Sequence, residues 1–545
     1  MSTRFILLLS VALLHAQTAR SETYHVAQRH AAASDGNSGA ANAPWKTISK
    51  AAEALRPGDT VVIHTGVYRE QITPARSGTS EAPISYQAAQ GEEVVITGAD
   101  VITDWQRVKE NIWKKEPWPF QFPTHPNNER HRLIGRCEQL IVDGTLLEQV
   151  STREDLVAGS FCADTKADVL YVWLPDGANP NERTVEASVR PMCFGISRGR
   201  EAKHHVCVRG IIFRYAANTA QRGVLLIRGD NWLVEDCTAE WTNGTGICFR
   251  GDNITLRRVR SHHNGQQGMS GSGRDFLLEE VVLDHNNTKD FDKDWEAGGI
   301  KITHARNGVV RRCRSVANNG NAFWFDIDVR DVVVERCFCK NNAGHGIYVE
   351  ISGGFQIRDN LCVHNGTDDK WGYGGISIAE SDHCTIEQNT CVLNLAGISI
   401  REQGPRAFPG MDGAEVTYRV HDVTIRRNIC ALNTKYQFGL WWDNVFFGPH
   451  PSGGPEGTPF DPDTCNIRLD HNLYWKEGKQ RLALWGCPWR SNHSKYDDLV
   501  AWQHERGQDT GSLLADPLFV APKAGDWRIR SDSPARRLPA GPANE

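Results

Sequence analysis

The chain has 545 residues, 40% of them apolar, and a formal net charge of −5. Its length and apolar content suffice for a long buried core, and its slightly acidic balance excludes the basic surface that nucleic-acid binding requires. The 50 glycines and 17 tryptophans suit tight turns and exposed aromatic platforms. We therefore expect a protein that binds no nucleic acid.

Residues 1–21 are predicted to be a signal peptide. Arg4 precedes the largely apolar run 5–14 (FILLLSVALL), and small residues follow at 16–19. The run is too short to cross a bilayer, and no later run of that length lacks charges. We expect an exported protein, secreted or periplasmic, with no membrane span and a monomeric state.

Residues 22–96 are predicted to form an N-terminal cap and the first coils of a repeating structure. Tyr24–Val26 and Thr60–His64 have the pattern of short strands, and Thr47 is placed to N-cap a helix that runs to Leu55. A helix at this point would cover the open end of a stacked core. Residues 97–192 lack the repeat and alternate in polarity, which predicts an inserted small β-subdomain.

Residues 193–502 carry a repeat with two strand types. The first type recurs at 232–237, 254–259, 276–281, 309–313, 332–337, 355–360, 384–389, 423–428 and 467–472. The second type begins after a small residue at 223, 246, 268, 299, 322, 346, 375, 397 and 439. Spacings mostly in the low twenties, with strands and no helices, indicate a solenoid whose coils stack about 4.8 Å apart. Residues 503–545 are predicted to be a C-terminal tail.

The cysteines follow the same repeat. Cys237, Cys313 and Cys337 occupy the position that Asn360 and its equivalents fill elsewhere. Cys339, Cys362, Cys391 and Cys430 fall two residues after that position in their own repeats. This pattern favours buried thiols over disulfides, although a pair such as Cys137–Cys162 is an open alternative in an exported chain.

With this repeat, and with Asp516-Pro517-Leu518-Phe519 and Asp526-Trp527-Arg528-Ile529 near its end, the chain resembles the right-handed parallel β-helix, or pectate-lyase-like, superfamily of secreted carbohydrate-active proteins. The resemblance covers most of 24–540. It implies an all-β fold: a right-handed parallel β-helix solenoid with an N-terminal capping helix and an inserted small β-subdomain. One fold hosts many chemistries, so the reaction must be argued from the site.

Two consecutive repeats carry an unusual outward pattern. Ala322-Phe323-Trp324-Phe325-Asp326 aligns with Gly346-Ile347-Tyr348-Val349-Glu350, which lies 346 − 322 = 24 residues later. Alternation on a strand turns the first and third apolar residues inward and the aromatic and acid outward. Stacked acids repel, and such a violation of local rules is expected where function requires it.

We therefore predict a sugar-binding groove on this face, with Asp326 and Glu350 as the catalytic carboxylates. Insertions at 284–297, 366–374, 403–419 and 443–466 would form its walls. The residues expected to bind substrate are Glu296, Lys301, Trp324, Asp328, His345, Tyr348, Glu380, Arg401 and Glu402.

Paired carboxylates suit hydrolysis of a glycosidic bond. One protonates the leaving oxygen, while the other attacks the anomeric carbon or activates water. Adjacent coils would set Asp326 and Glu350 about 5 Å apart, as in a retaining pair, whereas Asp326 and Glu380 would be about 9.5 Å apart, as in an inverting pair. Crowding would raise the pKa of one acid. No cofactor is required for this reaction.

A uronate lyase or epimerase is the alternative enzyme class. Asp294-x-Glu296 followed by Lys301 resembles the acidic pair and catalytic lysine of chondroitinase-B-like and alginate lyases, which implies Lys301 as base with Ca²⁺ assistance. The chain departs from that pattern by having Asp first. Gly344-His345-Gly346 resembles a polygalacturonase motif, but the Asp pair of that family precedes its strand, so its roles are not carried over.

A third hypothesis is a non-catalytic glycan-binding surface protein, which would need only aromatic and hydrogen-bonding groups. Stacked acids count against it, because binding a neutral sugar does not call for crowded like charges. The histidine pairs His204-His205 and His262-His263 lack a third ligand at suitable spacing, so no metal site is expected.

Overall fold

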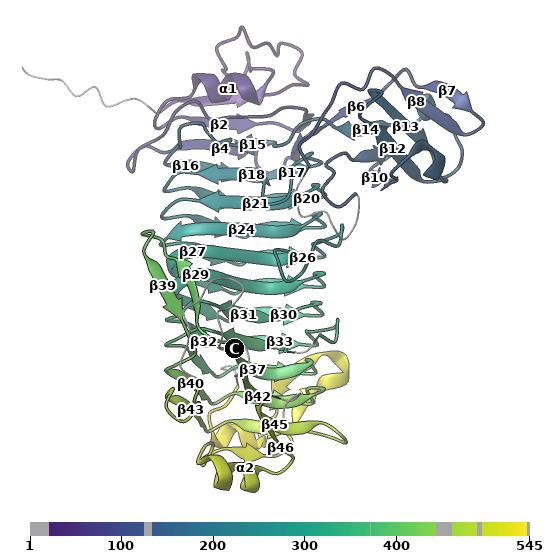
Figure 1. Ribbon diagram of the computed structural model, residues 1–545. Coiled ribbons are helices and arrows are strands. Elements are labelled where there is room, and N and C mark those ends of the chain that lie inside the picture. Colours follow the sequence, from purple (N-terminus) through teal and green to yellow (C-terminus); the bar gives the residue numbers. More distant parts are fainter. Residues whose placement is uncertain (1–20, 125–132, 371, 443–459, 488–492, 542–545) are drawn as a thin grey trace, which may run out of the picture.

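The computed structural model describes residues 21–124, 133–370, 372–442, 460–487 and 493–541. The predicted signal peptide therefore lies almost wholly outside the described residues, as does most of the insertion 443–466. The described chain forms a tall stack of parallel coils, with a separate β-rich lobe beside its N-terminal end (Figure 1). The solenoid prediction is confirmed.

Each coil contributes strands to three faces. The first face, called here the site sheet, consists of β18 (Gly223–Arg228), β21 (Thr245–Arg250), β24 (Gln267–Arg274), β27 (Gly298–Arg311), β29 (Asn321–Glu335), β31 (Ile347–Glu350), β34 (Ile376–Ala379), β37 (Ala396–Glu402), β42 (Tyr436–Trp442) and β45 (Arg481–Gly486). The long strands β27 and β29 continue onto the second face, so the two faces share one 23-stranded sheet.

The second face holds β16 (Val206–Arg209), β19 (Leu233–Glu235), β22 (Thr255–Arg257), β25 (Leu277–Glu279), β32 (Gln356–Arg358), β35 (Thr385–Glu387), β40 (Val423–Arg426) and β43 (Ile467–Asp470). The third face is a 13-stranded sheet of β3 (Gly66–Tyr68), β5 (Val94–Thr97), β17 (Ile211–Arg214), β20 (Thr238–Glu240), β23 (Arg260–His262), β26 (Val282–Asp284), β28 (Arg314–Val316), β30 (Phe338–Lys340), β33 (Leu361–Val363), β36 (Thr390–Val392), β41 (Ile429–Ala431), β44 (Leu473–Trp475) and β47 (Leu513–Leu514).

Sharp corners separate the second and third faces, and they were not predicted. One residue per coil adopts the left-handed conformation there, with φ of 54° at Asp236, 51° at Arg258 and 56° at Glu280. These positions hold ordinary polar side chains rather than glycine, so no glycine signal marks them in the sequence. The left-handed conformation costs roughly 1–2 kcal/mol for a residue with a side chain, and pairing of the flanking strands with the neighbouring coils must outweigh that cost.

The interior is filled by stacked apolar side chains and by two ladders of polar ones. Inward residues such as Phe323, Ile347 and Ile376 lie in register and are fully buried. Asn342 accepts hydrogen bonds from the backbone and side-chain N–H of Asn318, and its own side chain donates to Asn365. The cysteines Cys339, Cys362, Cys391 and Cys430 stack in one file, as predicted.

The cysteine chemistry agrees with the thiol hypothesis. Cys137 and Cys162 are both buried free thiols, so the disulfide alternative for that pair is wrong. Burial raises the pKa of the Cys137 thiol to about 12. A protonated, enclosed thiol is unreactive, which fits a packing role.

The N-terminal end is covered as predicted. Helix α1 (Ile48–Ala54) begins after Thr47, whose side chain accepts a hydrogen bond from the Lys50 N–H. It buries Ile48 and Ala51 over the first coils, which hold β1 (Thr23–Val26), β2 (Thr60–Ile63) and β4 (Ile84–Ala88). A second helix, α2 (Leu499–Arg506), lies at the other end of the stack and buries Trp502; it was not predicted (Figure 1).

The inserted subdomain consists of two sheets that project from the N-terminal coils (Figure 1). One contains β6 (Ala99–Val101), β9 (Leu140–Val142), β10 (Thr145–Leu146) and β14 (Val185–Ser188). The other contains β7 (Gln106–Lys109), β8 (Ile112–Lys115), β11 (Glu148–Gln149), β12 (Ser160–Asp164) and β13 (Val169–Trp173). The subdomain has its own core, which includes Trp105, Phe161 and Val172.

Two predicted strand starts on the site sheet are off by one or two residues. Leu225 pairs with Ile247, so position 224 rather than 223 is equivalent to the small residue Gly246. Ile398 pairs with Phe438, so position 437 rather than 439 is equivalent to the small residue Gly397. Trp441 consequently pairs with Arg401. The acid expected beyond it, Asp443, is outside the described residues.

Candidate active site

A cavity of about 490 Å³ lies over the site sheet between β29 and β42. Its floor comes from strand residues, and its walls come from the segments before β27, before β34 and after β37. The lining residues with polar or aromatic side chains are Asp294, Asn321, Trp324, His345, Tyr348, Glu350, Lys370, Tyr373, Ser377, Ser399, Arg401, Gln403, Arg406 and Trp441.

The predicted register of the floor is confirmed. Trp324 pairs with Tyr348, and Asp326 pairs with Glu350, on the neighbouring strands β29 and β31. The indole and phenol rings stack with centroids 5.6 Å apart. Lys301 also lies over the Trp324 ring and His345 also stacks on Tyr348, so both rings are packed between protein groups.

Glu350 is held by three donors. Arg401 and Arg406 donate to Oε1 at 3.0 and 2.7 Å, and the Trp324 indole N–H donates to Oε2 at 3.2 Å. Burial acts to raise the pKa of Glu350, but the two guanidinium groups outweigh it and lower the pKa to about 2. The carboxylate is therefore ionised at neutral pH and fixed in orientation.

Asp326 differs from Glu350 in charge environment and in access. Its carboxylate pairs with the Lys301 ammonium at 2.8 Å. Burial, opposed by Lys301 and reinforced by Glu350, raises the pKa of Asp326 to about 6. Asp326 is 5% exposed and does not line the cavity, so the expectation that it faces open solvent is wrong.

His345 lies between the floor and one wall. Its ring stacks on Tyr348 at 4.2 Å and meets Tyr373 edge-on at 4.7 Å. Its Nδ1 accepts from the Gly374 N–H and sits 2.7 Å from the Ser377 hydroxyl, which assigns the proton of the neutral ring to Nε2. Burial and Arg401 lower the pKa of His345 to about 3, so the ring is neutral in the working range.

Asp294 supplies the second carboxylate that lines the cavity. It sits on the wall before β27, where it pairs with the Lys370 ammonium and accepts from the Tyr373 hydroxyl at 2.9 Å. Although burial opposes it, these donors lower the pKa of Asp294. The wall is thus cross-linked to the 366–374 insertion.

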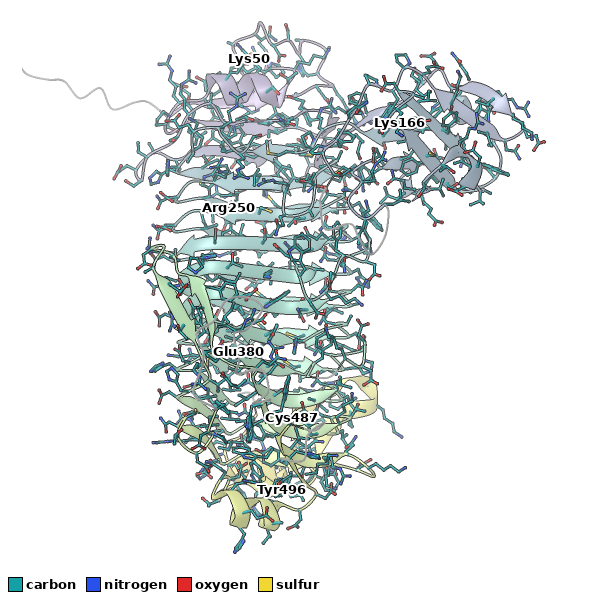
Figure 2. All side chains as sticks on the ribbon, in the orientation of Figure 1. Lys50, Lys166, Arg250, Glu380, Cys487 and Tyr496 are labelled. Atoms are coloured by element: carbon teal, nitrogen blue, oxygen red, sulfur yellow. The ribbon has the colours of Figure 1, made fainter. Side chains whose placement is uncertain are left out.

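Three predicted site acids lie behind the cavity rather than in it. Glu380 is fully buried and accepts from Arg401 at 3.3 Å and from the Gln403 N–H at 2.7 Å (Glu380 is labelled in Figure 2). Asp328, also fully buried, binds Arg306 at 2.6 Å and the Met411 N–H at 2.7 Å. Glu402 is 1% exposed and accepts from the Val420 N–H at 2.8 Å. Their expected solvent exposure is wrong, and they hold loops in place.

The loop that they hold contains a hairpin of β38 (Arg406–Pro409) and β39 (Glu415–Tyr418). The hairpin lies along the edge of the coils that contain β27 and β29, far from it in sequence (Figure 1). It delivers Arg406 to Glu350. Sequence reasoning recognised the insertion as a wall but missed Arg406, Lys370 and Tyr373, because loop residues have no repeat position that reveals their direction.

A second cavity of about 540 Å³ lies over the preceding coils and is lined by Glu296 and Lys301 together with Ser270, Thr303 and others. Lys301 Nζ sits 3.8 Å from the Trp324 ring centroid, so these two residues form the boundary between the cavities. Glu296 accepts from Gln267 at 2.9 Å and also binds Gln221. Asp294 and Glu296 therefore bind different neighbouring residues. Their carboxylates do not point at one common position, as the calcium pair of the lyase hypothesis requires.

Comparison with known proteins agrees with this architecture. A family model described as "Right handed beta helix region" matches residues 222–391. The solved structure "The complex structure of XylC with xylose" superposes with a TM-score of 0.64 at 19% identity, over 86% of this chain and 87% of that one. This chain has the right-handed parallel β-helix fold.

Two curated proteins resemble this β-helix in sequence. The uncharacterized protein YwoF of Bacillus subtilis (strain 168) is 20% identical over 505 residues, which cover 92% of this chain and 90% of YwoF. Pectate lyase L of Paenibacillus polymyxa (strain SC2) is 23% identical over 354 residues, which cover 60% of this chain and 68% of the lyase. Among the described residues of the β-helix, no helix is long and apolar enough to cross a membrane.

Proposed function

We propose that this β-helix is a carbohydrate-active enzyme that hydrolyses glycosidic bonds of an oligosaccharide or polysaccharide bound over the site sheet. One observation carries the proposal: stacked aromatic rings and an ionised, oriented carboxylate, Glu350, line the same cavity. The names of two similar proteins, a pectate lyase and a xylose-bound XylC, support carbohydrate chemistry. Export to the cell exterior or periplasm remains part of the proposal.

The pair Asp326 and Glu350 is the proposed catalytic dyad. The two lie in register on adjacent strands, whose spacing of about 4.8 Å suits a retaining mechanism. Their surroundings separate their pKa values, to about 6 and about 2, so one is available as an acid while the other is ionised. Such divergence within a pair is how one site obtains both acid and base.

The position of Asp326 suits a substrate that spans both cavities. Asp326 contacts Lys301, which lines one cavity, and lies two residues after Trp324, which lines the other. A glycan that occupied both would cross this boundary, where displacement of the Lys301 side chain would expose the carboxylate. Apo geometry alone does not rule out a catalytic group, because catalytic contacts often form fully only when substrate is bound.

A uronate lyase or epimerase is the second candidate, favoured by one observation. Lys370, Arg401 and Arg406 all line the main cavity and would attract a uronate carboxylate. Lys301 is a poor base for that reaction, because its ammonium donates to Asp326 and to the Trp295 carbonyl, the latter at 2.8 Å, and has no lone pair to accept a proton. His345 is also a poor base, because its Nδ1 already accepts from the Gly374 N–H and its pKa is lowered to about 3.

A substrate screen separates these proposals. The purified protein is incubated with a panel of neutral and uronate polysaccharides and their oligomers, with and without a chelator. New reducing ends without ultraviolet absorbance support hydrolysis, whereas absorbance from an unsaturated uronate supports the lyase. Binding of glycans with no product in either assay would favour the non-catalytic hypothesis and overturn the enzyme proposal.

A further inference from the structure

We propose that Asp382, His383, His421 and Asp422 form a site for a divalent transition-metal cation of the Zn²⁺ class, outside the cavity described above. Within the described residues, ligand atoms of Asp382, His383 and His421 all lie within 4.8 Å of one another. Asp422 adjoins both imidazoles, at 3.6 Å from His383 Nε2 and 2.8 Å from His421 Nδ1. The proposal goes beyond the proposed function and does not depend on it.

The backbone places the four residues on two neighbouring coils, with Asp beside His in each direction. Asp382 forms a parallel bridge with His421 of the next coil, and the His383 N–H donates to the His421 carbonyl at 3.1 Å. His383 therefore lies beside Asp422, and each imidazole directs one ring nitrogen towards Asp382 and the other towards Asp422. Because the sequence order is Asp-His on one coil and His-Asp on the next, the motif is invisible as a linear spacing.

The separations suit a small cation. A tetrahedral zinc site with bonds of about 2.0–2.1 Å places its ligand atoms about 3.3 Å apart. Here the His383–Asp382 contact is 2.9 Å and the His421–Asp382 contact is 4.0 Å. The imidazole side chains are 62% and 42% exposed, so each can rotate to present one nitrogen.

The acids are already oriented by other groups. Arg330 donates to both Asp382 oxygens, at 2.9 and 3.1 Å, which leaves each oxygen a further lone pair. Asn466 donates to Asp422 Oδ1 at 2.5 Å. Partners of this kind fix the direction of carboxylate ligands in metal sites. Two nitrogen and two oxygen donors match zinc better than calcium or magnesium.

The location gives the ion a structural consequence. His421 lies three residues after β39, the returning strand of the hairpin, and Asp382 lies three residues after β34. Arg330 also packs over the Tyr418 ring of β39 at 5.6 Å. A bound ion would fasten the hairpin's return to the preceding coil, so binding is expected to raise the melting temperature and protect the hairpin from proteases.

The test uses the full chain, freed of metal with a chelator and then dialysed. Titration with Co²⁺ is expected to give visible d–d absorption that saturates at one ion per chain and is displaced by Zn²⁺. His383→Ala and His421→Ala are each expected to weaken binding at least tenfold and to abolish the rise in melting temperature on adding Zn²⁺. His383→Gln repeats the test with a polar replacement should the alanine variant fold poorly.

His471→Ala is the matched control, because that imidazole also pairs with an aspartate, Asp470, at 2.9 Å but lies outside the cluster. It is expected to bind Co²⁺ and Zn²⁺ as the unaltered chain does. Absence of saturable Co²⁺ absorption would overturn the proposal. So would equal affinity in the His383 variants and the control, which would indicate adventitious binding at other histidines.

Discussion

The asparagine ladder inside the β-helix and the site sheet above it use polar groups in opposite ways. In the ladder, Asn318, Asn342 and Asn365 repeat one residue type on successive coils, and the oxygen of each accepts two hydrogen bonds from the coil before it. On the site sheet, successive coils present Asp326, Glu350 and Ala379 at one position. The first arrangement is uniform and the second differs from coil to coil.

The difference extends to hydrogen-bond satisfaction. Ladder side chains are buried and fully partnered, whereas Asp326 Oδ1, Arg401 Nε and Arg406 Nε are buried atoms that make no hydrogen bond. An unsatisfied buried polar atom costs roughly 1–3 kcal/mol. Such a cost is expected where binding or catalysis requires it, and atoms of this kind also occur outside the site sheet, at Trp113 Nε1 and Asp284 Oδ1 for example.

The largest effect is expected from neutralising the dyad. Glu350→Gln and Asp326→Asn should each lower kcat/KM about 10²–10⁴-fold in the assay that detects product, because each removes one acid–base partner while preserving shape. Circular dichroism should show an unchanged fold. Glu335→Gln, which alters a carboxylate paired with Arg358 on the second face, is the matched control and should retain activity. Full activity in both dyad variants would remove the assignment.

Breaking the asparagine ladder should lower stability and leave activity unchanged. Asn342→Ala deletes the acceptor of two hydrogen bonds and two donors, and should lower the free energy of unfolding by about 2–4 kcal/mol. Activity per folded molecule should not change. Denaturant titration measures the first quantity, and Gln356→Ala, at an exposed position on β32, should stay within about 0.5 kcal/mol of the unaltered chain. A large loss of kcat without a loss of stability would contradict the assignment of a purely structural role to the ladder.

Arg406 lies on the hairpin after β37 and, together with Arg401, balances the negative charge of Glu350. Arg406→Gln should reduce activity about 10–100-fold. The guanidinium lowers the pKa of Glu350, so its removal should raise that pKa and move the acidic limb of the pH–rate profile to higher pH. Arg358→Gln, which removes the equivalent partner of Glu335, should leave the profile unchanged. An unshifted acidic limb would show that Glu350 does not control it.

The repeat was predictable from sequence because stacking imposes one inward pattern on every coil. The register of Trp324 with Tyr348 and of Asp326 with Glu350 followed from that pattern alone. Burial of Asp326, Asp328 and Glu402 did not, because it depends on where the insertions fold back. Residues that reach the cavity from insertions, such as Arg406 and Tyr373, occupy no repeat position, so their contacts depend on loop conformation that periodicity does not encode.

The smallest effect concerns Glu402, a carboxyl group that the site sheet keeps behind its cavity. Burial and the nearby Glu380 raise the pKa of Glu402 to about 8, well above its value in an unfolded chain. Between these two values the folded state holds a proton that the unfolded state has released, so this group makes stability fall as pH rises from about 4.5 to 8. Glu402→Gln keeps an oxygen for the Val420 N–H and should remove that fall.

The gain in stability relative to the unaltered chain is expected to be small at pH 5 and to grow steadily up to pH 8. Melting temperatures measured across this range test it. If the two proteins show parallel pH profiles, Glu402 is ionised in the folded state. Of the three carboxyl groups Asp326, Glu350 and Glu402, only the first two would then have a shifted pKa, beside Lys301, Arg401 and Arg406. The difference between the site sheet and the asparagine ladder would then apply only to the residues at the cavity.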